Sequence, residues 1–93
     1  LPISLLEAGT AGLFLISSAV GGIPELLEQG RGELFRPGSE EELSRRMVAA
    51  VSAPDETRNR ARRCQEFIRS RYSVPAVAES YLSLIDICFR SNI

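Results

Sequence analysis

A short apolar run, Leu13–Ile16, constrains the fold of this chain more than any other stretch. Gly12 precedes the run, and a serine pair, Ser17 and Ser18, follows it. A continuous apolar run of this length, bounded by turn residues, is typical of a strand that is buried on both faces of a parallel sheet. Such a strand needs helices above and below it, so we predict an α/β fold.

The residues on either side of this run predict a helix before it and a glycine turn after it. Pro2 suits the first position of a helix, and Gly9 and Gly12 bracket the end of that helix. After the run, the turn Val20–Gly22 can adopt positive φ and bring backbone N–H groups close to a ligand. Because ligands bind outside the carboxyl ends of the strands in open parallel sheets, this turn is the candidate site.

The middle of the chain predicts a short helix, a second strand and a capped helix. A helical turn opens at Ile23–Glu25 and closes at Gly30, and the second strand is Glu33–Phe35. Ser39 caps the next helix, and Glu42 stands where the partner in a capping box would be. The predicted apolar stripe of that helix consists of Leu43, Met47, Ala50 and Val51.

Two further helices are predicted towards the end of the chain. Pro54 ends the preceding helix, Asp55 caps the next one, and Tyr72-Ser73 breaks it. Its apolar face consists of Ala61, Cys64, Phe67 and Ile68. A final helix from about Pro75 carries more apolar surface than one small core can cover, which indicates an interface.

Length bounds the chain to one small domain. At 93 residues a compact fold buries only about 60 to 65 per cent of its unfolded surface, so its stability would be marginal. A fully apolar parallel strand also needs neighbours on both edges, yet the sequence predicts only two strands. We therefore expect a fragment that forms the last part of a larger doubly wound domain.

The residue types exclude several kinds of chemistry. All basic residues are Arg, and the absence of Lys and His removes a Schiff-base lysine, a histidine base and a histidine metal site. Cys64 and Cys88 lie on different predicted helices without paired spacing, which favours free buried thiols over a disulfide or a metal centre. We expect neither a metal nor a cofactor.

Charge patterning argues against a nucleic-acid partner. The chain has 12 acidic and 11 basic residues, so no overall field favours a polyanion. An arginine-rich helix could form a phosphate-binding face, but its arginines are spread around the helix, acidic residues offset them and no aromatic residues interleave. These arginines are Arg58, Arg60, Arg62, Arg63, Arg69 and Arg71.

No apolar run of about twenty residues and no signal-peptide pattern occurs. We expect a cytoplasmic location, with peripheral membrane association through regions outside this chain.

Three groups of residues resemble a known family. They are Pro2–Ala8, then Ala11-Gly12 ahead of the apolar run, and then Val20–Glu25. Together they resemble the donor-binding core of the retaining glycosyltransferases of family 4 (group 1), which have the GT-B fold. The resemblance implies the C-terminal part of a Rossmann-like domain with two short parallel strands and several helices. It extends over nearly the whole chain, but only residues 2–25 are specific. Departures from the family pattern, which affect the pocket wall, occur at Gly9, Thr10, Phe14 and Ala19.

The resemblance also implies a donor site at Glu7, Gly21, Gly22 and Glu25. Glu7 matches the second of two glutamates on the donor side of the family's cleft, where its carboxylate would bind the ribose hydroxyls of a sugar nucleotide. The first glutamate would precede Leu1. Gly21 and Gly22 form either a backbone wall against the donor or an ordinary turn, and Glu25 either reaches into the cleft or solvates the short helix. No catalytic residue is assigned.

Two functions of different kinds follow as hypotheses. The first is a retaining glycosyltransferase, as in polysaccharide biosynthesis, that moves a hexosyl unit from a UDP- or GDP-linked sugar to a hydroxyl acceptor such as a glycan or lipid. This chain alone would be inactive. The second is a truncated, non-catalytic α/β module that serves as an interaction domain.

We expect the chain to divide into three parts: a donor-site core at 1–38, two surface helices at 39–73, and a C-terminal helix at 74–93 that docks on an N-terminal domain.

Overall fold

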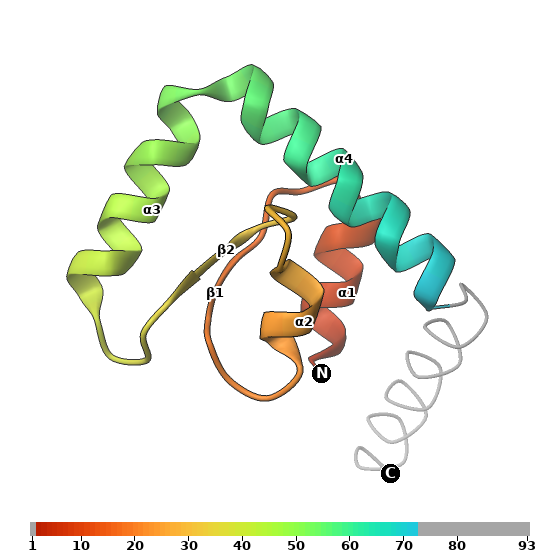
Figure 1. The fold of residues 1–93 in the computed structure, drawn as a ribbon, viewed down its shortest axis with the longest axis horizontal. Helices are drawn as coiled ribbons and strands as arrows, with labels where there is room; N and C mark the ends of the chain where they lie inside the picture. The colour runs from red at the N-terminus through yellow and green to blue at the C-terminus, as the bar shows by residue number, and fades with distance from the viewer. Residues whose placement is uncertain (1, 73–93) are drawn as a thin grey trace, which may run out of the picture.

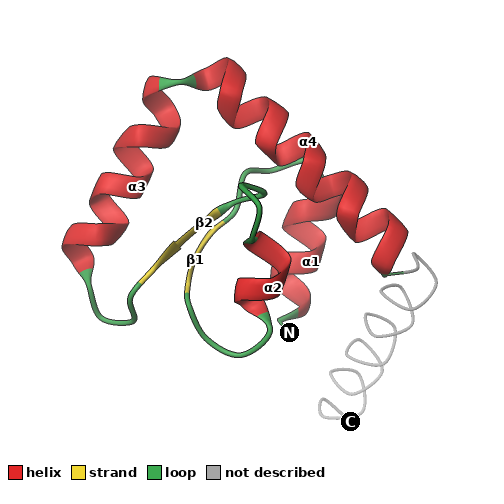
Figure 2. Cartoon of the chain, viewed as in Figure 1, coloured by secondary structure: helices red, strands yellow, loops and turns green. Residues whose placement is uncertain are grey.

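The computed structural model of the chain describes residues 2–72. In chain order the elements are α1 (Ile3–Thr10), β1 (Ile16–Ser18), α2 (Ile23–Leu27), β2 (Glu33–Phe35), α3 (Glu40–Ser52) and α4 (Pro54–Arg71) (Figure 1). The described residues form an α/β fold with two parallel strands and four helices (Figure 2), which confirms the predicted fold class. The final helix, its docking role, Ser73 and Cys88 lie outside the described residues.

Helix α1 differs in detail from the prediction at both of its ends. Pro2 is the N-cap, in extended conformation, and not the first helical residue. Gly9 lies inside the helix and is buried, while Gly12, with φ +86°, follows the C-cap. The backbone N–H groups of Gly12 and Leu13 donate to carbonyls within α1, at 3.0 Å each, and so close its last turn.

This closing turn shifts the first strand along the chain. Leu13 is 59% exposed, and only Leu15 of the apolar run is buried. The strand is Ile16–Ser18, and all of its residues are partly exposed, so the prediction of a buried strand at Leu13–Ile16 is wrong. The reason is that Leu13 completes the end of α1, which leaves the next residues to cross from the helix to the sheet.

The second strand has the predicted bounds, Glu33–Phe35, and pairs with β1 in parallel. The register joins Ile16 to Glu33 and Ser18 to Phe35. The ladder is extended by the Glu33 N–H, which donates to the Leu15 carbonyl at 3.0 Å. Close approach at Gly32 allows this arrangement, because a Cβ there would lie 2.7 Å from the Leu15 carbonyl oxygen.

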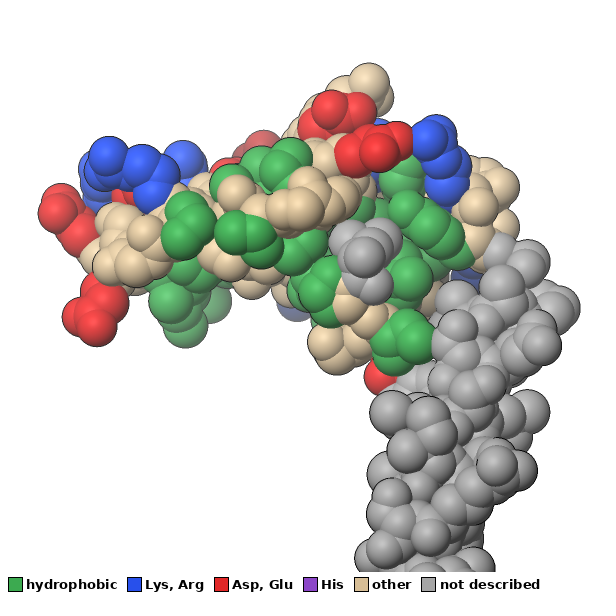
Figure 3. Space-filling model, turned by 90° about the horizontal axis from the view of Figure 1, so that it is seen from below, with side chains coloured by type: hydrophobic (Ala, Val, Ile, Leu, Met, Phe, Trp, Pro, Cys, Tyr) green, Lys and Arg blue, Asp and Glu red, His purple; other side chains and the backbone are tan. Residues whose placement is uncertain are grey.

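Helix α3 packs along the sheet but contributes no fully buried residue. Ser39 is its N-cap, as predicted, and its hydroxyl accepts a hydrogen bond from the Glu42 N–H at 3.2 Å. The capping box is incomplete, because the Glu42 carboxylate accepts from the backbone and side chain of Arg36 instead. The predicted apolar stripe is largely exposed, with Met47 at 54% and Val51 at 77%. Hydrophobic side chains are open at the α3 end of the molecule (Figure 3).

Helix α4 carries the buried face that the sequence predicts. Ala61, Cys64 and Ile68 are buried, and Phe67 packs against the core as a partly buried residue. At its start the prediction was wrong, because Pro54 is the first residue of α4, Ala53 is the N-cap, and Asp55 lies in the first turn without capping it. Proline fits there because its missing N–H would have no helical partner.

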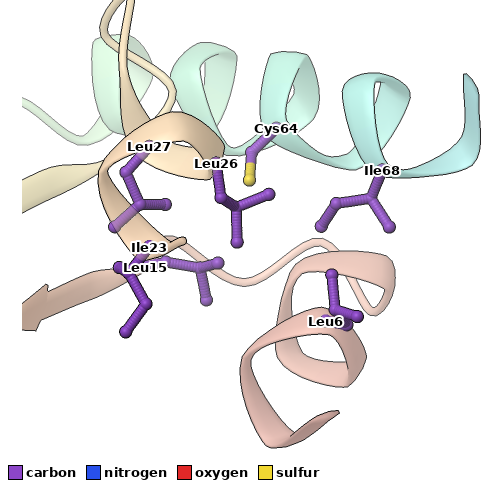
Figure 4. Packing of buried hydrophobic residues seen from close by; sticks show 7 residues of the cluster. All are labelled: Leu6, Leu15, Ile23, Leu26, Leu27, Cys64 and Ile68. Atoms are coloured by element: carbon purple, nitrogen blue, oxygen red, sulfur yellow. The ribbon is translucent and has the colours of Figure 1, made fainter. Parts of the chain in front are cut away.

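The core lies where α1, α2 and α4 meet. Its members come from each of these helices and from the loop before β1, as Figure 4 shows: Leu6, Leu15, Ile23, Leu26, Leu27, Cys64 and Ile68. Burial of each large aliphatic side chain contributes about 1.5 to 3 kcal/mol relative to exposure. None of the helices within residues 2–72 has the length and apolarity to span a bilayer.

Candidate functional site

The turn after β1 is open to solvent. Gly21 has φ +53°, as a left-handed turn residue requires, whereas Gly22 has φ −82° and is the N-cap of α2. No atom lies within 4 Å of a Cβ built at either glycine among the described residues. Within residues 2–72, neither glycine N–H donates a backbone hydrogen bond. The turn therefore presents backbone donors on an uncovered surface.

Two hydrogen bonds define the shape of this turn. The Ala19 N–H donates to the Phe35 carbonyl at 3.0 Å, which ties the end of β1 to the end of β2. The Ile23 N–H donates to the Val20 carbonyl at 3.2 Å and closes the turn. The turn thus follows the carboxyl end of a parallel strand, where the sequence placed it, and that end is where open α/β sheets bind ligands.

Glu7 lies on α1 and is partly buried. Its carboxylate makes no hydrogen bond and no ion pair with any other residue in the described part of the chain. No such bond joins Glu7 to Gly21, Gly22 or Glu25 within residues 2–72. A carboxylate without a partner among residues 2–72 retains its acceptor capacity for a ligand as far as these residues are concerned.

Glu25 already has a protein partner. Its Oε1 accepts from Arg71 Nη2 at 2.6 Å, which links α2 to the last turn of α4. Both side chains are more than half exposed. The Glu25 backbone carbonyl is also engaged, because Arg31 Nη2 donates to it at 2.7 Å. The structure therefore places Glu25 in contact with α4.

Arg31 is the residue that the sequence interpretation missed. It is 8% exposed, the one buried charged residue within residues 2–72. Its Nε donates to the Leu26 carbonyl at 2.8 Å, and its guanidinium lies over the Phe67 ring at 3.7 Å from the centroid. No local pattern marks it, since its burial depends on α4.

Arg60 of α4 holds the segment between α2 and β2. Its guanidinium donates to the carbonyls of Gly30 and Gly32, at 2.6 and 2.9 Å, and to Glu33 Oε1 at 2.6 Å. Arg63 adds bonds to the carbonyls of Gln29 and Gly30. The planar fork of a guanidinium carries several N–H donors and so suits bonding to several acceptors at once. These arginines act on the protein's own backbone in this structure.

The described part of the chain holds no cluster of side chains that could bind a metal ion. Among residues 2–72 no group of three or more Cys, Asp or Glu side chains is placed to hold a metal ion. Cys64 is a free, buried thiol, as predicted. Burial raises the pKa of this thiol, and the nearby positive charge of Arg31 opposes the rise.

The parallel pair β1 and β2, joined in sequence through the helix α2 and with a glycine turn at the carboxyl end of β1, is the arrangement of a Rossmann-like α/β fold. Comparison with protein families is more specific. The chain belongs to the family described as glycosyl transferases group 1, whose model matches residues 1–70. This confirms the resemblance carried by residues 2–25.

A relative supports the same family. The chain is 30% identical over 90 residues to the phosphatidylinositol N-acetylglucosaminyltransferase gpi3 subunit of Schizosaccharomyces pombe (strain 972 / ATCC 24843). The match covers 96% of this chain and 20% of that protein. The chain thus spans about a fifth of the length of the curated relative it matches. No solved structure matches the chain.

Proposed function

We propose that this chain forms part of the nucleotide-sugar donor site of a retaining glycosyltransferase. The enzyme would move a hexosyl unit from a UDP- or GDP-linked sugar to a hydroxyl acceptor. The family supports this, and the observation that carries it is the partly buried residue Glu7, whose carboxylate has no partner among residues 2–72. The resemblance to the family implies that the matching position binds ribose hydroxyls.

The roles proposed for the site follow from the chemistry of its groups. The Glu7 carboxylate accepts hydrogen bonds from both ribose hydroxyls, which are stronger when the acceptor is charged. The backbone of Gly21 and Gly22 lies against the donor, where the absence of side chains permits close approach. The direct contact between Glu25 and the donor that the sequence predicts would compete with the ion pair from Glu25 to Arg71. No catalytic group is assigned to this chain.

The acceptor is proposed from the relative. Its name joins phosphatidylinositol with N-acetylglucosaminyl transfer. This favours a lipid-borne hydroxyl acceptor over a soluble glycan for the enzyme to which this chain would contribute. The charge that develops on the departing diphosphate would be stabilised by cationic side chains and backbone N–H groups, and the resemblance implies that the relevant Arg and Lys lie upstream of this stretch.

Titration of UDP and of GDP into the ¹⁵N-labelled 93-residue chain tests the donor site. We expect weak binding, with chemical-shift changes centred on Glu7, Gly21 and Gly22. Glu7→Gln should lower the affinity about tenfold, because an amide replaces a charge-assisted acceptor. Glu41→Gln, on exposed α3, is the matched control. Equal affinities for Glu7→Gln and the native chain would overturn the ribose role.

The exposed apolar residues of α3 favour a second candidate, a non-catalytic interaction module. Met47, Val48 and Val51 are each more than half exposed. An interaction module would bind neither UDP nor GDP, and its self-association or partner binding would weaken in Val51→Glu. The nucleotide titration therefore separates the two candidates.

A further inference from the structure

Arg31 binds the carboxyl end of α2 through two hydrogen bonds. Its guanidinium donates to the carbonyls of Glu25 and Leu26, at 2.7 and 2.8 Å, in a site where the side chain is almost completely buried. A buried guanidinium is costly unless its N–H groups find acceptors, and here two helix carbonyls supply them. Glu28 lies only at the edge, with its carboxylate 4.0 Å from Nη2 and largely exposed. Arg31 therefore bonds chiefly to the backbone of α2.

Phe67 connects this arrangement to α4. The guanidinium of Arg31 lies 3.7 Å from the centroid of its ring, and that of Arg71 lies 5.7 Å from it. Arg71 also pairs with the Glu25 carboxylate at 2.6 Å. Glu25, Arg31, Phe67 and Arg71 thus form one closed set of contacts between the α2 region and α4, in which Arg31 bonds to the Glu25 backbone carbonyl and Arg71 to the Glu25 carboxylate. We call this set the clamp.

The clamp acts on the candidate donor turn through α2. Gly22 is the N-cap of this helix, and the Leu26 N–H donates to the Gly22 carbonyl at 3.4 Å. Because α2 has only five residues, little of it can bend between the clamp and the turn. The glycines of the turn have no packing contact of their own within 4 Å of their built Cβ positions among residues 2–72. The turn is therefore held at one end by the Ala19 bond to the sheet and at the other end by α2, so a shift of α2 would reorient its glycines.

We propose that Arg31 is a positioning residue for the donor turn, and that Glu25 acts as its partner in the clamp instead of as a donor ligand. The inference rests on the proposed function, because it concerns the turn assigned to the donor. Arg31 contributes more to holding the donor turn than the Glu25–Arg71 ion pair does. Arg31 is buried, whereas that ion pair is exposed and is weakened by solvent.

Amide hydrogen exchange of the 93-residue chain tests the clamp without any ligand. Arg31→Met should speed exchange of the Ile23 and Leu26 N–H groups about tenfold, because their bonds belong to the turn and α2. The Leu43 N–H, bonded to Ser39 on α3, should be unchanged. Arg31→Lys keeps the charge but not the planar fork, and should give an intermediate increase. Arg45→Met, on the exposed face of α3, is the control.

A charge exchange separates positioning from ligand contact. Glu25→Arg alone and Arg71→Glu alone should each speed exchange at Ile23 several-fold and weaken UDP or GDP binding. The double variant restores an opposite-charge pair, so it should return both quantities to within about twofold of native. Recovery of exchange without recovery of nucleotide affinity would show that Glu25 contacts the donor, and would overturn its assigned role.

The remaining outcomes are also decisive. Equal acceleration at Ile23, Leu26 and Leu43 in both Arg31 variants would mean that Arg31 stabilises the whole fold, which overturns the proposal. Unchanged exchange in these variants would overturn it as well. Absence of nucleotide binding by the native chain, with local acceleration in the variants, would instead reject the proposed function and support the clamp.

Discussion

Gly9 of α1 lies so close to Ile68 of α4 that a Cβ at position 9 would overlap the Ile68 Cδ1 atom. The same Cβ would lie 3.4 Å from Leu15 Cδ1 and 3.8 Å from Cys64 Sγ. Glycine at this position therefore sets how near α1 approaches α4. The sequence interpretation gave Gly9 a role in ending the helix, whereas its role is in packing.

Gly9→Ala should destabilise the chain despite the better helix propensity of alanine. The propensity gain is about 1 kcal/mol, and overpacking a buried contact costs about 1 to 3 kcal/mol. We expect a net loss of about 1 kcal/mol in the free energy of unfolding by urea. Ile68→Val removes the overlapping Cδ1 and should offset much of that loss in the double variant. Simple additivity of the two single changes would contradict the contact.

Arg60→Met should destabilise the chain by about 2 kcal/mol, since it removes charge-assisted bonds to two carbonyls and a carboxylate. Arg58→Met is the matched control on the same helix, because Arg58 is exposed and pairs only with the exposed Asp55 within the described residues. It should change the free energy of unfolding by less than about 0.5 kcal/mol. Similar losses in both variants would argue against the Arg60 contacts.

The folded chain should become less stable as the pH is lowered, and Glu42 should account for part of this loss. Bonds from the Arg36 side chain, and then from its backbone N–H, lower the pKa of the Glu42 carboxyl. The stabilisation is therefore complete above the unfolded pKa, about 4.3, and is lost as pH falls through the lower folded pKa. Melting temperatures of the native chain and Glu42→Gln should differ at pH 7 and converge towards pH 3. A constant difference across this range would exclude the Arg36 contact as its cause.

The Cys64 thiol should react slowly with a disulfide reagent while the chain is folded. It is fully buried, and burial raises its pKa, so little thiolate is present or accessible. In a Cys88→Ser background, the rate of thiol modification at pH 8 should rise steeply across the urea unfolding transition. Fast modification in the absence of urea would show that the core around Cys64 opens readily.

Local patterns predicted those parts of the fold that depend on neighbouring residues. The bounds of β2, the Ser39 cap and the buried face of α4 all follow from short-range signals and are confirmed. The first strand was misplaced because a run such as Leu13–Ile16 does not reveal that its first residue closes the preceding helix. The sequence predicts the apolar stripe of α3 but not its degree of burial, and in the structure Met47 and Val51 are more than half exposed.

The candidate site was predictable in position more than in detail. The glycine turn lies after β1 as expected, since that depends on the order of strand and turn. The partners of Glu25 could not be foreseen, because Arg71 is distant in sequence and meets it only when α4 packs on α2. The burial of Arg31 has the same origin. The roles of Glu7, Gly21 and Gly22 towards a donor stay predictions.

The core described above also bears on how the chain folds during its synthesis. Five of its seven residues precede residue 28, and the other two, Cys64 and Ile68, lie on α4. At about 5 to 20 residues per second, a ribosome needs seconds to pass from Leu27 to Ile68. During that interval α4 is not yet present to cover the apolar side chains of α1 and α2. Nascent chains are therefore most exposed to chaperone capture, or to premature association with one another, in the time before α4 emerges.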